Sequence, residues 1–133
     1  TEVVLRAASL VGDSLVGVVV FGSWARGKAQ AESDVDVLVV LDPRRPITRD
    51  LYRAWDETPV TWGDRPVEPH FVNLPPPDER VAGLWAEVAI DGIVLQARDE
   101  ALPLRLGQIR RDIVDGRIVR RTAHGQPYWT EVA

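Results

Sequence analysis

Four stretches of apolar residues predict the strands of a β-sheet. The two strongest cover residues 16–21 and 34–41, where Val, Leu and Phe follow one another between glycine and polar residues, as in buried strands. A third strand is predicted over 67–74, where Pro69 indicates an edge position or a bulge, because proline cannot donate a hydrogen bond to a neighbouring strand. The short apolar run 93–96 predicts one further strand.

Apolar residues spaced three or four positions apart predict helices between these strands. The predicted helices are residues 2–14, 24–29, 47–57, a segment that starts at Asp78 as N-cap and ends at Gly92, and a last helix around 102–113 that Gly116 caps. The chain from Arg117 onward predicts a β-hairpin with its turn at His124-Gly125. Helices alternating with strands favour an α/β fold, a mixed β-sheet flanked by helices, with a C-terminal helix and β-hairpin. We expect a core over residues 1–98 and, over 99–133, an extension of the same domain.

The composition limits the classes of protein to which the chain can belong. Its 133 residues suffice for one compact domain, and 45% apolar with 27% charged residues is typical of a globular protein. A net charge of −4 argues against nucleic-acid binding, and the absence of cysteine excludes disulfides and thiol chemistry. No apolar run reaches the roughly 18 residues of a membrane span, so we expect no membrane contact and a cytoplasmic location.

Candidate chemistry lies at the start of the strand predicted over 34–41. Asp34 and Asp36 are two residues apart, so their carboxylates project from one face, about 7 Å apart along the strand. Such a pair is costly unless a cation holds it, and Mg²⁺ takes oxygen ligands of this kind. The Gly22-Ser23 turn between a strand and a short helix leaves backbone N–H groups free for phosphate oxygens. A solvated strand entrance at the aspartates and a plain helix cap at Ser23 are the alternatives; together the two features favour a nucleotide-handling enzyme.

The spacing of these residues, Gly22-Ser23, ten residues, then Asp34-x-Asp36, forms a GS-x10-D-x-D signature. With it, the chain resembles the minimal nucleotidyltransferases of the DNA polymerase β superfamily, closely over 21–41 and in the order of elements up to about residue 98. The resemblance implies the nucleotidyltransferase fold and transfer of AMP from ATP. It also implies two Mg²⁺ ions held at the aspartates, with the triphosphate seated at Gly22 and Ser23.

The resemblance further implies a third carboxylate on the next core strand. Asp64 and Glu68 are the acids near that strand, and we choose Glu68 because it lies inside it; the alternative is an exposed edge residue. A glutamate beside proline departs from the family's usual aspartate between aliphatic residues. His70 shares the Glu68 face by alternation, and we interpret it as a satisfied interior or edge histidine, with contact to metal, phosphate or acceptor as the alternative. Arg26 is the cation expected to neutralise the triphosphate, or else an ordinary surface residue.

The acceptor of the AMP group is inferred only from the resemblance. Small members of the superfamily are often antitoxins that adenylylate a tyrosine of a partner HEPN-domain ribonuclease, and this toxin–antitoxin role is our leading expectation. The acceptor surface would then come from such a partner or from a homo-oligomer. The alternatives are transfer to a small molecule such as an aminoglycoside, and a catalytically degenerate module that acts by protein or nucleic-acid contact. The C-terminal region is rich in arginine, which fits a docking surface or a solvated helix and hairpin.

Overall fold

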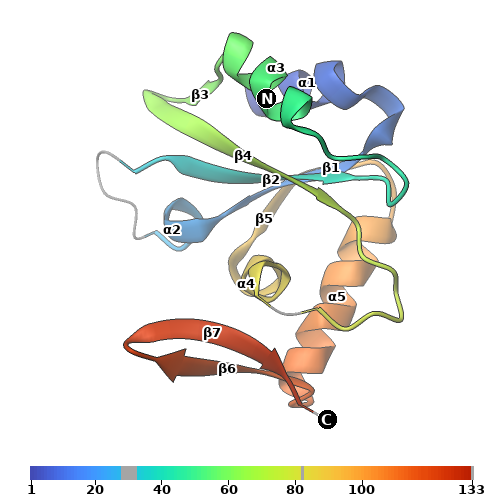
Figure 1. The fold of residues 1–133 in the computed structure, drawn as a ribbon, viewed down its shortest axis with the longest axis vertical. Helices are drawn as coiled ribbons and strands as arrows, with labels where there is room; N and C mark the ends of the chain where they lie inside the picture. Colours follow the sequence, from blue (N-terminus) through green and yellow to red (C-terminus); the bar gives the residue numbers. More distant parts are fainter. Residues whose placement is uncertain (28–32, 82, 133) are drawn as a thin grey trace.

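The computed structural model describes residues 1–27, 33–81 and 83–132, which form a five-stranded sheet with helices on both faces and a separate hairpin (Figure 1). The order of strands across the sheet is β3-β4-β2-β1-β5. β2 and β4 are parallel, and the other neighbouring strands are antiparallel. The predicted mixed α/β fold with a C-terminal helix and hairpin is confirmed.

The strands lie close to the apolar stretches of the sequence. They are β1 (Leu15–Phe21), β2 (Val35–Leu41), β3 (Thr61–Trp62), β4 (Arg65–Asn73), β5 (Ile93–Ala97), and the hairpin strands β6 (Ile118–Ala123) and β7 (Gln126–Glu131). The helices are α1 (Glu2–Val11) with a following 3-10 turn (Gly12–Ser14), α2 (Gly22–Ala25), α3 (Arg49–Glu57), α4 (Leu84–Asp91) and α5 (Ala101–Val114). The helix predicted over 24–29 instead begins at Gly22, with Phe21 and not Ser23 at its N-cap, and ends at Ala25; residues 28–29 of the prediction lie outside the described part of the chain.

Two apolar layers, one on each side of the sheet, hold the helices in place. On one side α1 and α3 bury Ala7 and Trp55 against β-strand residues such as Val37. On the other side α4 and α5 bury Val88 and Leu106 against the opposite face of the same strands. Figure 1 shows the first pair of helices above the sheet and the second pair below it. β1 and β2 are buried on both faces, and this explains their continuous apolar sequences.

The proline in β4 is tolerated because its missing N–H lies on the outer side of the strand. Val67 and Phe71, which share the parity of Pro69, donate their backbone N–H groups away from β2, to Val60 O (3.1 Å) and to the Tyr52 hydroxyl (3.1 Å). β3 pairs only with Arg65 and Pro66, so no strand of the described chain covers the outer side of β4 at Pro69. The predicted edge position is therefore confirmed for this residue.

Two further local expectations were wrong. The helix assigned to the segment after Asp78 begins at Leu84, because Arg105 of α5 donates to the carbonyl oxygens of Pro75 and Glu79 and holds the segment in a turn. Burial lowers the pKa of Arg105, and these carbonyl contacts compensate the buried cation. The two-residue strand β3 had no counterpart in the prediction.

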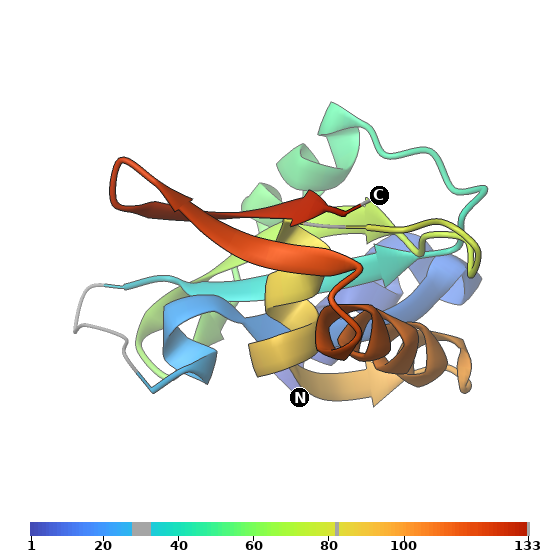
Figure 2. The same cartoon turned by 90° about the horizontal axis from the view of Figure 1, so that it is seen from below.

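The hairpin lies below α4, on the side away from the sheet (Figures 1 and 2). The indole N–H of Trp129 donates to the Glu87 carboxylate of α4 at 2.8 Å, and Trp129 packs against the apolar layer that α4 and α5 form. Within the described ranges, no helix is long and apolar enough to cross a bilayer.

Candidate active site

Three strands place candidate functional residues at one edge of the sheet, the edge formed by strand ends and not by an outermost strand. β1 ends where the parallel strands β2 and β4 begin, and Phe21, Asp36 and Glu68 lie directly opposite one another across them. Residues in register on neighbouring strands project from the same face. This is the face that α4 and α5 cover further along the strands, and at the edge it carries carboxylates in place of apolar side chains.

Asp36, Glu68 and His70 form a compact cluster at this edge. One potential ligand atom from each residue lies within 4.8 Å of the other two. Nε2 of His70 lies 3.2 Å from Oδ1 of Asp36, within hydrogen-bonding distance. The side chains of His70 and Asp36 keep 35% and 29% of their surface exposed, so solvent and solutes can reach the cluster. Two carboxylates and an imidazole in this arrangement are a donor set that fits a divalent cation.

Gly22 approaches this cluster more closely than a residue with a side chain could. Its φ is +80°, in the left-handed region, and a Cβ atom added there would lie 2.6 Å from Oδ2 of Asp36. Glycine is therefore required at this position both by the backbone conformation and by the space that the carboxylate occupies. The Gly-Ser turn and Asp36 of the sequence motif thus meet in space, although twelve residues separate them along the chain.

The other residues predicted from the sequence lie around this point. Ser23 is half-buried in α2, and Arg26 is exposed at the C-terminal end of that helix. Asp34 is exposed and precedes β2 by one residue, and its carboxylate is outside the cluster that the described residues form. The structure therefore brings Gly22, Asp36 and Glu68 together and leaves Asp34 at the margin.

His70 joins the cluster from β4. The half-buried, partnered histidine expected at this position is present, but its partner is Asp36 of the cluster. Its ring packs edge-on against Phe21 with the ring centroids 5.2 Å apart. The alternation that placed it beside Glu68 was the available signal, and the register of β4 with β2 brings it next to Asp36.

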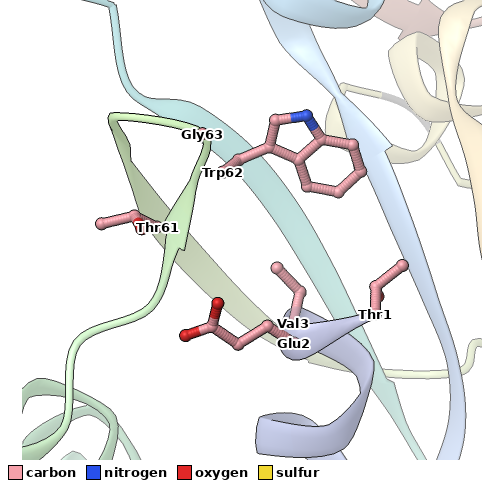
Figure 3. Close-up of a pocket in the computed structure, with 6 residues that line it drawn as sticks. All are labelled: Thr1, Glu2, Val3, Thr61, Trp62 and Gly63. Carbon is pink, nitrogen blue, oxygen red and sulfur yellow. The ribbon is translucent and has the colours of Figure 1, made fainter.

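A pocket on another part of the surface includes none of the three cluster residues among its lining residues. This pocket of about 200 Å³ is formed where the start of α1 meets the β3–β4 turn, with Thr1, Val3 and Trp62 among its lining residues (Figure 3). The Trp62 ring also contacts Trp24, the residue after the Gly-Ser turn, with ring centroids 5.1 Å apart. Trp24 is half-buried and packs against the layer formed by α1 and α3.

The sequence matches one family of known proteins and several individual proteins. Residues 3–103 match the family described as nucleotidyltransferase domain. The chain is 31% identical over 121 residues to spectinomycin 9-adenylyltransferase of Staphylococcus aureus (strain N315), which covers 79% of this chain and 46% of that protein. It is 42% identical over 50 residues to a putative protein adenylyltransferase of Methanocaldococcus jannaschii, over 36% of this chain and 34% of that protein. The chain thus spans less than half the length of these curated relatives.

Two solved structures share the fold. One is a chain of a toxin–antitoxin crystal structure with AMP-PNP, with a TM-score of 0.53 and 17% identity over 81% of this chain and 82% of that chain. The other is a chain of a mutant of the MntA–HpeT toxin–antitoxin pair, with a TM-score of 0.52 and 15% identity over the same shares. At these identities the match is evidence for the fold, and function has to be argued from the site.

Proposed function

Because this chain belongs to the nucleotidyltransferase domain family, we propose that it is a divalent-cation-dependent enzyme that transfers AMP from ATP to a hydroxyl group of a partner protein. The observation that carries the proposal is the convergence of Asp36 and Glu68 beside Gly22, at the edge where three strands meet. A third carboxylate that pointed away would have favoured the degenerate binding module considered above. Instead, Glu68 shares one cluster with Asp36.

Asp34, Asp36 and Glu68 would hold the two Mg²⁺ ions expected from the sequence, with Asp34 the member outside the present cluster. When bound, such ions neutralise triphosphate charge and lower the pKa of an acceptor hydroxyl. The backbone at Gly22 and Ser23 would seat the β- and γ-phosphates, and the exposed Arg26 would offset their charge.

In the proposed reaction the acceptor oxygen bonds to the α-phosphorus while the bond from that phosphorus to the bridging oxygen breaks. Pyrophosphate leaves, and the proton of the acceptor hydroxyl passes to the Glu68 carboxylate, which is exposed to solvent at the edge of the sheet. Orientation of the acceptor and neutralisation of charge supply most of the rate enhancement in reactions of this type.

Two observations support a protein acceptor. The alignment with the structural neighbour from a toxin–antitoxin complex covers 81% of this chain and 82% of that chain, so the two domains are similar in extent. One relative, over a shorter alignment, is described as a putative protein adenylyltransferase. A tyrosine of a HEPN-domain ribonuclease is the acceptor that we propose within this class.

A small-molecule acceptor is the second candidate, because 79% of this chain aligns with a spectinomycin adenylyltransferase. That enzyme is more than twice as long as the aligned part. Transfer of label to spectinomycin by this chain alone would favour the second candidate over the first.

The test of the proposed function is transfer of label from ATP labelled at the α-phosphorus, with Mg²⁺ and a HEPN-domain protein as acceptor. We expect Asp36→Asn to lower transfer by at least about 100-fold, because the variant loses a charged oxygen ligand. Asp50→Asn is the matched control, since Asp50 lies on α3, is 86% exposed and forms an ion pair with the exposed Arg53. Equal transfer by Asp36→Asn and Asp50→Asn, or no transfer to any hydroxyl acceptor by the wild-type protein, would contradict the proposal.

A further inference from the structure

An imidazole nitrogen lies among the carboxylates of the cluster. Glu68 and His70 are two residues apart on β4, so their side chains project from one face, and Asp36 lies opposite Glu68 on β2. His70 is thus placed by strand pairing at the same edge as the two acids. Its Nε2 atom is 3.2 Å from Oδ1 of Asp36, and the ligand atoms of all three residues lie within 4.8 Å of one another.

The separation of His70 from Asp36 agrees with two ligands of one small cation. Two ligands at about 2.1 Å from an octahedral cation stand about 3.0 Å apart when adjacent and about 4.2 Å apart when opposite. The 3.2 Å between His70 and Asp36 is close to the first value. A cation between the three residues would therefore replace the His70–Asp36 hydrogen bond with only small side-chain movements.

The ring of His70 is also held in position. It packs edge-on against Phe21, the β1 residue that lies opposite Asp36. Only 35% of the His70 side chain is exposed. A ring fixed in this way loses less conformational freedom when it binds a metal than a mobile surface histidine does. The packing is thus suited to a ligand that is positioned before the cation arrives.

The nitrogen donor changes which cation the site should prefer. Mg²⁺ favours oxygen ligands and binds imidazole poorly, whereas Mn²⁺ and the later divalent transition metals accept both carboxylate and imidazole. We propose that His70 is a nitrogen ligand of the divalent-cation site and gives the site a preference for Mn²⁺ over Mg²⁺. The inference rests on the proposed function, because the same carboxylates would hold the cation that assists AMP transfer.

The test uses the wild-type chain with Mn²⁺ alone as the probe. We expect pulsed electron paramagnetic resonance of the Mn²⁺-loaded protein to show modulation from a coordinated imidazole nitrogen. The chain contains two histidines, so two variants assign the signal. His70→Gln should abolish it. His124→Asn should keep it, because His124 is exposed in the hairpin turn at φ +51°, a conformation that asparagine tolerates.

Affinity provides the second readout. By calorimetry, we expect His70→Gln to weaken Mn²⁺ binding by about 10- to 100-fold, the range found when groups that support a metal site are removed, and to change Mg²⁺ binding far less. His124→Asn should match the wild-type protein for both cations. The nitrogen signal is read on the wild-type chain, so the proposal stays testable even where His70→Gln folds poorly.

The outcomes separate this inference from the proposed function. Mn²⁺ binding without nitrogen modulation, with His70→Gln and wild-type affinities equal, would overturn the role of His70 and leave the enzyme proposal intact. Failure of the wild-type protein to bind Mn²⁺ or Mg²⁺, with or without ATP, would overturn both. Nitrogen modulation that persists in His70→Gln and disappears in His124→Asn would also overturn the assignment.

Discussion

Substitution of Gly22 by alanine tests the central feature of the site, the close approach of the Gly-Ser turn to Asp36. The φ of +80° at Gly22 costs an alanine about 1–2 kcal/mol, because its Cβ crowds the following carbonyl oxygen. The added Cβ would also lie 2.6 Å from Oδ2 of Asp36, so the carboxylate or the turn must move. We expect a total destabilisation of about 1–3 kcal/mol, since strained positions of this kind fall in that range.

The control for Gly22→Ala is Gly116→Ala. Gly116 has a similar φ of +74°, but a Cβ there would meet no atom within 4 Å. Both variants therefore carry the backbone cost, and Gly22→Ala alone displaces Asp36. For a chain of this length 1 kcal/mol corresponds to about 4 °C in the unfolding midpoint, so we expect a decrease of about 4–8 °C for Gly116→Ala and about 4–12 °C for Gly22→Ala.

Cation binding and AMP transfer distinguish the two variants. By calorimetry at a temperature where both are folded, Gly22→Ala should bind the divalent cation at least about 10-fold more weakly than the wild-type chain, because one ligand is out of place. Gly116→Ala should bind it as the wild-type chain does. If Gly22→Ala binds the cation and transfers AMP to the same extent as Gly116→Ala, the contact between the turn and Asp36 has no role in the site.

Three further substitutions test the site and the packing that supports it. Glu68→Gln should lower AMP transfer by at least about 100-fold with the unfolding midpoint unchanged. Its control, Asp64→Asn in the exposed β3–β4 turn, should retain activity, and equal activities of the two variants would remove Glu68 from the site. Trp55→Ala removes a side chain that is 2% exposed between α3 and the sheet and should cost about 3–5 kcal/mol in urea unfolding, and a cost below 1 kcal/mol would mean that the layer repacks. Arg105→Met leaves the Pro75 and Glu79 carbonyl oxygens without their donor, so hydrogen exchange should become faster over residues 78–81; unchanged exchange would show that the turn does not depend on this side chain.

The main strands could be predicted from their continuous apolar runs, and the face that Glu68 and His70 share could be predicted from a period of two. Val35 and Val37 fill the layer of α1 and α3, and Asp36 between them points to the opposite face. The same alternation on β4 correctly placed Glu68 and His70 together. A pattern that repeats within a few residues carries this information without knowledge of the rest of the fold.

Other features depend on contacts between distant residues and could not be predicted from local patterns. The closeness of His70 to Asp36 results from the pairing of β2 with β4, which joins residues 34 positions apart. Asp78 has the chemistry of a helix cap, but contacts from Arg105 to its neighbours favour a turn instead. In both cases tertiary structure decides between local alternatives that the sequence leaves nearly equal.

Asp34 shows where strand pairing stops determining the site. Asp36 is fixed because it is paired on both sides, with Phe21 of β1 and with Glu68 of β4. Asp34 has the right parity for the face that carries Asp36. The first paired residue of β2 is Val35, however, so no hydrogen bonds of the described sheet hold the Asp34 backbone in place. The carboxylate of Asp36, whose backbone is paired, is already in the cluster, and that of Asp34, which precedes the paired residues, lies outside it. A cation bound at Asp36, Glu68 and His70 would attract the Asp34 carboxylate by charge, so the sheet would preform part of the proposed metal site and the bound cation would complete it.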